Sequence, residues 1–225
     1  MYNLLYLALT ICMFTLCSRL YSRFRTPLLL PVLTSTFLII IILVIFSVEY
    51  SDYYNGSHWL SELLGPAVVA LAYPLYNNRR ILLDNWKSIV YGTGFGFAIG
   101  FICLYSLSAL LSVDHFVLKS MYPKSVTTPV AMEIARNAGG SPRLAALFVM
   151  VTGISGAMFA PFLFRYLRLT SPAARGIALG ASSHAIGTSK AIEFGDEDAA
   201  FSSVAMAVSC LIASVWIPVW MLIMH

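Results

Sequence analysis

The sequence predicts an all-α polytopic membrane protein. Composition is the first reason, because 59% of the 225 residues are hydrophobic and only 11% are charged, whereas soluble domains carry about 25% charged residues. The second reason is that the apolar residues form long runs, and the third is that arginines cluster between those runs. We therefore expect a single transmembrane domain over residues 1–225, with a lipid bilayer as its solvent.

Five stretches lack charged residues and are long enough, or nearly so, to cross about 30 Å of hydrocarbon. They are residues 1–18, 26–48, 88–113, 144–164 and 199–224. Residues 1–18 lack a basic start and a small-residue cleavage site, which indicates a retained helix and not a signal peptide. Three further segments are apolar but interrupted: residues 63–78, 123–140 and 171–195.

The charges predict how these segments cross the membrane, because short cytoplasmic loops are rich in Lys and Arg. Three basic clusters belong inside, around residues 19–25, 79–87 and 165–175. The N-terminus is then outside, residues 171–195 cross outward, and the C-terminus is cytoplasmic. Residues 123–140 cannot cross without moving the third cluster outside. We therefore expect a re-entrant element there, covered by protein or facing a water-filled cavity.

This layout repeats a straight, a broken and a straight segment in residues 26–113 and, with opposite direction, in residues 142–224. Inverted repeats with interrupted helices are typical of secondary transporters, whose sites lie where the helices break. The fold class is therefore an inverted-repeat, transporter-like bundle with broken and re-entrant helices. The residues expected to break or hinge the helices are Gly65, Pro66, Pro74, Pro129 and Gly187.

Residues 124–129 read as a helix start, with Thr128 as N-cap and Pro129 in the first helical position. A helix N-terminus attracts anions, and Lys124, Ser125 and Thr127 add a charge and two donors. We favour an anion-binding site over the alternative, an ordinary capped helix whose lysine reaches to the membrane surface.

Residues 182–189 place small polar residues and a histidine inside an apolar segment. Gly187 can break the helix there, and Thr188 or Ser189 can cap the half that follows. His184 is a candidate carrier of a co-transported proton. The alternative is a hydrogen-bonded packing histidine. We favour the functional role slightly, because ionisable groups inside a membrane are usually functional.

Other features have structural explanations. The glycine stripes Gly92/Gly96/Gly100 and Gly176/Gly180 predict close helix approach and make a homodimer possible. Glu133 and Arg136 are spaced to pair with each other. The four cysteines have no metal-ligand spacing, so we expect no metal and no cofactor. The clustering of basic residues between apolar runs indicates topology and no nucleic-acid partner.

Several motifs together resemble the LrgB/CidB family of bacterial inner-membrane proteins, and most closely its YohK branch. In chain order they are L-G-P-A-V-V-A-L-A-Y-P-L-Y at 64–76, P-K-S-V-T-T-P-V-A-M-E-I at 123–134, G-G-S-P at 139–142, T-G-I-S-G-A at 152–157, S-P-A-A-R-G-I-A-L-G-A-S-S-H-A-I-G-T at 171–188 and A-F-S-S-V-A-M at 200–206. Ser155 departs from the usual leucine, and residues 189–192 depart from the commoner alanine- and arginine-rich version.

The resemblance implies two accounts of function. In one, the protein works with a small holin-like membrane partner of the LrgA, CidA or YohJ type and regulates murein hydrolase activity and lysis. In the other, it carries small carboxylates, as relatives do with pyruvate in bacteria and with glycolate and glycerate in chloroplasts. We expect a secondary transporter of small monocarboxylates, with a non-transporting antiholin-like regulator as the alternative. A hydrolase that uses Ser155 or Ser183 with His184 is disfavoured, so the protein is not expected to be an enzyme.

Overall fold

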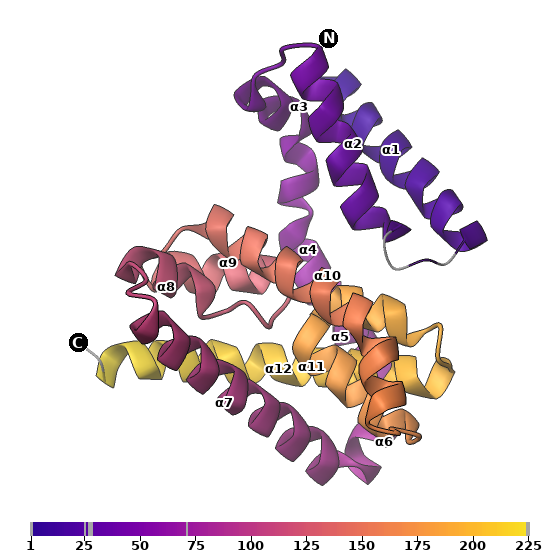
Figure 1. Ribbon diagram of the computed structural model, residues 1–225, viewed down its shortest axis with the longest axis vertical. Coiled ribbons are helices and arrows are strands. Elements are labelled where there is room, and N and C mark those ends of the chain that lie inside the picture. Colours follow the sequence, from indigo (N-terminus) through magenta and orange to yellow (C-terminus); the bar gives the residue numbers. More distant parts are fainter. Residues whose placement is uncertain (1, 25, 27–28, 71, 224–225) are drawn as a thin grey trace. The chain divides into compact units, whose positions relative to one another are not determined.

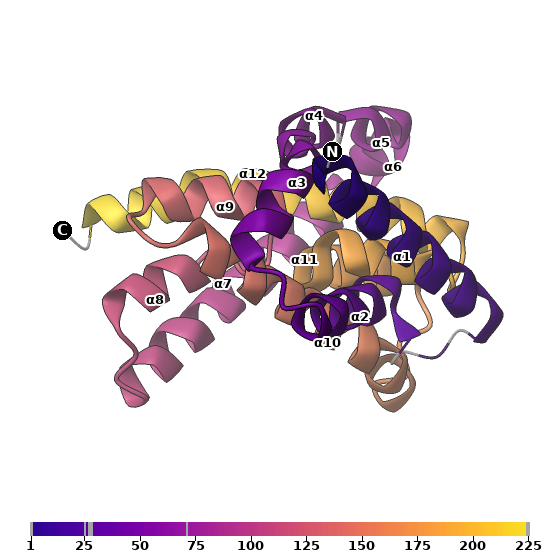
Figure 2. The same cartoon turned by 90° about the horizontal axis from the view of Figure 1, so that it is seen from above.

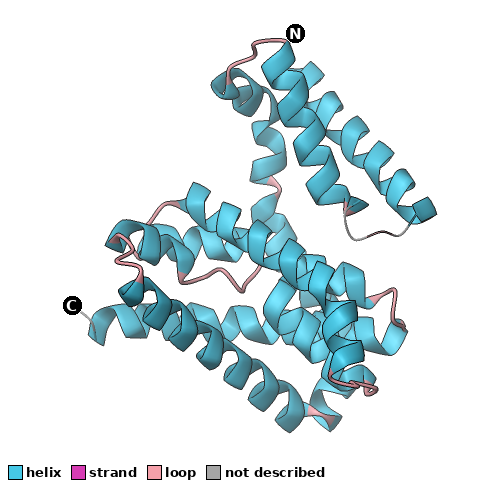
Figure 3. Cartoon of the chain, in the orientation of Figure 1, coloured by secondary structure: helices cyan, strands magenta, loops and turns pink. Residues whose placement is uncertain are grey.

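The computed structural model describes residues 2–24, 26, 29–70 and 72–223, and these residues form helices joined by loops, with no strand among them (Figures 1 and 3). Four helices in this part of the chain are long and apolar enough to cross a membrane: Leu4–Phe24, Trp86–Leu110, Pro142–Tyr166 and Asp196–Ile223. The apolar helix α2 (Pro31–Ile45) is shorter. The predicted all-α polytopic fold class is confirmed.

The chain divides into two compact units, Met1–Ala67 and Val68–His225. In the first unit, α1 (Tyr2–Phe24) packs against α2 and against α3 (Tyr50–Glu62). The hydroxyls of Thr10 on α1 and Tyr53 on α3 lie 2.8 Å apart. The division falls inside the predicted first repeat, residues 26–113, and the inverted repeat itself stays a prediction.

The predicted broken segment, residues 63–78, contains two short helices, α4 (Leu64–Ala70) and α5 (Ala72–Asn77), which α6 (Arg79–Asp84) follows. Gly65 and Pro66 lie in the first turn of α4, and Pro74 lies in α5. Proline is tolerated at Pro66 because the first-turn N–H groups have no partner within the helix. Whether these residues act as hinges stays a prediction.

Three long helices form the frame of the second unit: α7 (Trp86–Leu110), α10 (Pro142–Tyr166) and α12 (Asp196–Ile223). The start of α10 is set by Ser141, whose Oγ accepts a hydrogen bond from the Leu144 N–H, and by Pro142 in the first helical position. α12 packs against α7 along its length. Two helical hairpins fill the space that remains.

The first hairpin spans residues 115–141 and contains α8 (His115–Met121) and α9 (Thr128–Asn137). The Ser141 N–H donates to the Ser120 Oγ at 2.7 Å, so the chain returns to the place where it left α8. Gly139, at φ +76°, makes the turn after α9 that this return requires. The chain thus forms a helical hairpin here, and its re-entrant position in a bilayer, predicted for residues 123–140, stays a prediction.

The second hairpin is α11 (Pro172–Ala191), whose helical geometry is interrupted at His184 (φ 42°, ψ −130°). A Cβ on Gly187 would clash with the Leu179 carbonyl and with Ser183, which is possible only if the second arm folds back along the first. The prediction that Gly187 breaks this helix is wrong, because the chain reverses three residues earlier. Gly187 instead lets the two arms touch.

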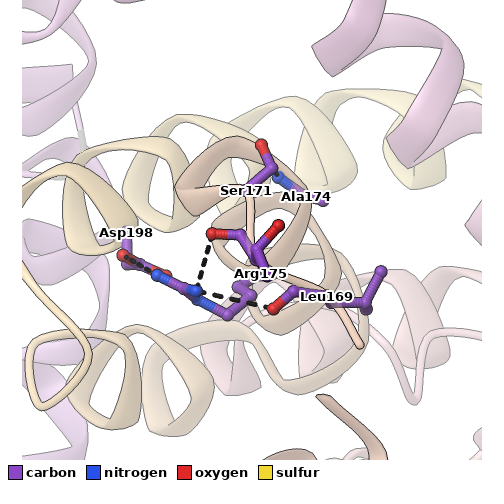
Figure 4. A network of polar contacts seen from close by, with 6 residues as sticks. Leu169, Ser171, Ala174, Arg175 and Asp198 are labelled. Carbon is purple, nitrogen blue, oxygen red and sulfur yellow. Dashed lines mark hydrogen bonds and ion pairs between the residues drawn. The ribbon is translucent and has the colours of Figure 1, made fainter. Parts of the chain in front are cut away.

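An ion pair closes the base of this second hairpin, and Figure 4 shows it at close range. Arg175 Nε lies 2.8 Å from Asp198 Oδ1, and a second guanidinium nitrogen lies 3.0 Å from Oδ2. Arg175 is near the start of α11 and Asp198 is in the first turn of α12. The prediction that residues 171–195 cross the bilayer is therefore wrong, since their two ends lie together. The predicted cytoplasmic C-terminus depended on that crossing and loses its basis.

The two hairpins occupy opposite halves of α12. In the first, Ile134 of α9 belongs to one apolar cluster with Ile217 near the C-terminal end of α12. In the second, Ile177 of α11 belongs to another with Phe201 near the N-terminal end. Figures 1 and 2 agree, with α8 and α9 beside the C-terminal end of α12 and α11 beside its other half. The hairpins thus approach the middle of the unit from opposite ends.

Candidate functional site

A cavity of about 750 Å3 lies in the second unit, where the two hairpins approach each other. Its wall is formed by α7, the loop before α9, the middle of α10 and the first arm of α11. The polar or glycine residues that matter for its chemistry are Gly92, Gly96, Gly100, Lys124, Ser125, Thr152 and Ser182. Among the described residues of the lining, Lys124 alone carries a charge.

The loop of the first hairpin brings Lys124 and Ser125 to this cavity. Tyr122 and Val126, on either side of them, are buried in the apolar cluster formed with α7, α10 and α12. The backbone turns tightly between these anchors, since the Val126 N–H donates to the Pro123 carbonyl at 3.2 Å. Two apolar anchors therefore hold the polar pair between them at the cavity wall.

The start of α9 differs from the prediction by one residue. The N-cap is Thr127, Thr128 is the first helical residue and Pro129 follows it. The Thr127 hydroxyl does not cap its own helix and lies 3.5 Å from the Cys210 Sγ of α12. Neither threonine lines the cavity, so the structure separates them from Lys124 and Ser125.

The tract at residues 182–189 also divides into two groups, and Ser182 was not among its predicted binding residues. Ser182 lines the cavity, and its Oγ lies 3.1 Å from the Ser183 Oγ. His184 is buried, and its Nε2 donates to the Val149 carbonyl at 3.0 Å. The Thr188 Oγ1 donates to the His184 carbonyl and lies 3.0 Å from the Ser202 Oγ of α12.

Gly187 is packed between the arms of α11, whereas Ser189 is exposed. Of the predicted substrate-binding residues, the structure thus brings only Lys124 and Ser125 to the cavity wall. A proton-carrying role for His184 and an anion-binding role for the other predicted residues stay predictions.

Sequence reasoning did not predict that Thr152 and the glycines of α7 line a cavity. Thr152 stands in the middle of α10 on the cavity wall, within the T-G-I-S-G motif that had signalled family resemblance only. Among the described residues, a Cβ on Gly96 or Gly100 would meet nothing within 4 Å, so these two glycines pack against no helix of this part of the chain, and the homodimer contact stays a prediction. The predicted close helix approach is right at Gly176 and Gly180, which lie against the backbone of α12.

Several other polar side chains form ion pairs or hydrogen bonds within the chain. Arg136 and Glu133 form the predicted pair at 2.9 Å, and Lys190 pairs with Glu193 at 2.6 Å. The Ser155 Oγ donates to the Val151 carbonyl of its own helix at 2.6 Å. In the described part of the chain, no three His, Cys, Asp or Glu side chains gather as metal ligands.

Residues 10–223 match the LrgB-like family. The chain belongs to this family. It is 42% identical to the uncharacterised protein YxaC of Bacillus subtilis strain 168 over 96% of this chain and 94% of the relative. It is 34% identical to the holin-like protein CidB of Staphylococcus aureus strain N315 over 99% of this chain and 97% of the relative. No solved structure gives a significant match.

A third relative, the holin-like protein CidB of Staphylococcus epidermidis, is 32% identical over 98% of this chain and 96% of the relative. Family membership and the apolar helices together identify a multi-pass membrane protein. Both CidB relatives are named as holin-like proteins. An assignment to the YohK branch stays a prediction.

Proposed function

We propose that this LrgB-like protein is a secondary transporter of small monocarboxylates that acts with a small holin-like membrane partner in the bacterial inner membrane. The observation that carries the proposal is the cavity between the two hairpins, with Lys124 as the one charge among its described lining residues. Both hairpins place irregular backbone next to this cavity. Non-helical backbone is tolerated at membrane depth only where protein or water can satisfy its N–H and C=O groups.

The chemistry of the lining suits a small monoanion. A lysine ammonium in a low-dielectric site is costly without a partner, and a carboxylate supplies both charge and hydrogen-bond acceptors. The hydroxyls of Ser125 and Thr152 also line the cavity and can donate to the remaining oxygens, whereas the Ser182 hydroxyl donates to the Ala178 carbonyl at 2.7 Å. A second carboxylate on the ligand would bring a negative charge for which the described lining residues offer no cation. The single lysine therefore favours a ligand that carries a single carboxylate.

The arrangement of the hairpins supports transport over passive binding. Transporters place their substrate where interrupted helices meet, and reach it alternately from the two sides of the membrane. Here the first hairpin contributes Lys124 from one end of the unit and α11 contributes Ser182 from the other. Movement of either hairpin would open the cavity toward the end of the unit from which that hairpin enters.

The alternative is a non-transporting, antiholin-like regulator of murein hydrolase activity and lysis. The holin-like names of the CidB relatives favour it. Such a regulator gains nothing from a lysine in a cavity at membrane depth, where a charge is expensive to maintain. Both accounts hold together if carboxylate flux is what alters lysis.

The test is uptake of labelled pyruvate and glycolate into proteoliposomes that contain the purified protein, with and without its holin-like partner. Protein-free liposomes and liposomes with the partner alone are the controls. The proposal predicts uptake that saturates with substrate concentration and competes with other small monocarboxylates, but not with dicarboxylates. Uptake no faster than in the controls, for every carboxylate and with the partner present, would leave the regulator as the better account.

A further inference from the structure

His184 has a backbone conformation that is unusual for its residue type. At φ 42° and ψ −130° it occupies a region that glycine enters freely and that other residues avoid. The sequence offers glycine three residues later, at Gly187, yet the reversal takes place at the histidine. Its side chain is only 2% exposed. A strained, buried histidine at a chain reversal persists only if its side chain makes contacts that glycine cannot make.

The contact is with α10. The His184 Nε2 lies 3.0 Å from the Val149 carbonyl oxygen, which can only accept, so Nε2 carries the proton and donates. The ring rests on Gly153, where a Cβ would lie 2.5 Å from the ring Cε1. Ser183 rests in the same way on Gly156. The glycines of the T-G-I-S-G motif thus form the surface on which the turn of α11 is seated.

This contact joins two walls of the cavity. On α11, Ser182 lines the cavity two residues before His184. On α10, Thr152 lines it and directly precedes Gly153, on which the ring rests. The bond from His184 to Val149 therefore ties the segment that carries Ser182 to the helix that carries Thr152. The ring itself is not among the residues that line the cavity.

We propose that His184 is a positioning residue of the transport site: its ring holds the turn of α11 on α10, and it transfers no proton to substrate or solvent. The role in transport rests on the proposed function, whereas the seating of the turn does not. Glutamine is the conservative replacement, because its amide N–H reaches about as far as Nε2 and cannot take up a proton. Alanine removes the donor and keeps the strained backbone, and glycine removes the donor and relieves the strain.

The experiment measures the turn directly. The four native cysteines are replaced by alanine, a Ser182→Cys change is added, and the rate of labelling by a charged thiosulfonate reagent is followed with His184, His184→Gln, His184→Ala and His184→Gly. We expect His184→Gln to label like the His184 parent. His184→Ala and His184→Gly should label about fivefold faster, the factor that one neutral hydrogen bond supports.

Carboxylate uptake by the same His184 variants, made with Ser182 intact, is the second readout. We expect His184→Gln to retain uptake that responds to a proton gradient as the wild type does, and the other two variants to raise KM more than they lower kcat. Loss of the gradient response in His184→Gln would overturn the proposal in favour of a proton carrier, and unchanged labelling in His184→Gly would overturn the seating role. If the wild type takes up nothing, the proposed function fails while the labelling rates still decide the seating.

Discussion

Replacing Arg175 by methionine removes the cation that faces the carboxylate of Asp198 at the base of the α11 hairpin. The two side chains make two short contacts, at 2.8 and 3.0 Å, and the guanidinium also donates to the Thr170 carbonyl at 2.9 Å. Methionine keeps the apolar stem and removes these bonds. The carboxylate then stays where folding has placed it, with no cation beside it.

The expected cost follows from burial. The Asp198 side chain is 2% exposed and that of Arg175 is 18% exposed. Removing one partner of a buried pair costs about 3–5 kcal/mol, because the other charge is left without compensation. Since water reaches part of the Arg175 site, we expect the lower end, about 3 kcal/mol. The double variant Arg175→Met/Asp198→Asn should lose less than Arg175→Met alone, because it leaves no charge behind.

The assay is equilibrium unfolding in detergent micelles, followed by the fluorescence of the four tryptophans. The chain supplies its own control in the Arg136–Glu133 pair, which has a similar contact at 2.9 Å but side chains that are 64% and 58% exposed. Arg136→Met should cost no more than about 0.5 kcal/mol. Equal losses for Arg175→Met and Arg136→Met, or a double variant less stable than Arg175→Met, would refute the reasoning.

Two further predictions concern packing and topology. Gly180→Ala should lower the free energy of unfolding by about 1–3 kcal/mol or prevent folding, because the new Cβ would clash with the Ser202 carbonyl. The Cβ of Gly96→Ala would meet open space, so this variant should be close to neutral in the same assay. With α11 re-entrant and the basic cluster at residues 165–175 inside, α12 crosses once more and a tag at the C-terminus should lie outside. Protease digestion of the tag in intact cells checks this, and full protection until the membrane is permeabilised would contradict it.

Much of the fold could be predicted from local sequence. Runs of apolar residues located α7, α10 and α12 to within a few residues, because length and hydrophobicity alone make a segment able to cross. The three arginines that follow residues 123–140 restricted the number of crossings and led to a re-entrant element, where the structure has a hairpin. Local patterns of this kind need no knowledge of distant contacts.

The second hairpin could not be predicted in this way. Residues 171–195 are long enough to cross, and contacts between residues far apart in the sequence, such as the pairing of Arg175 with Asp198, 23 residues away, show that they return. The position of the turn was also hidden, since Gly187 is the residue that a reversal favours and the contact of His184 with α10 overrides that preference. Nor does spacing reveal whether a glycine stripe packs, as Gly180 does, or lines a cavity, as Gly96 does.

The most direct test of the central claim, that the cavity holds a carboxylate at Lys124, is pyruvate uptake by proteoliposomes containing Lys124→Met. The matched control is Lys87→Met, which removes an exposed lysine at the start of α7, outside the residues that line the cavity. Loss of a charged hydrogen-bond partner is expected to lower kcat/KM about 10- to 100-fold in Lys124→Met, while Lys87→Met transports like the wild type. Wild-type uptake by Lys124→Met would contradict the account.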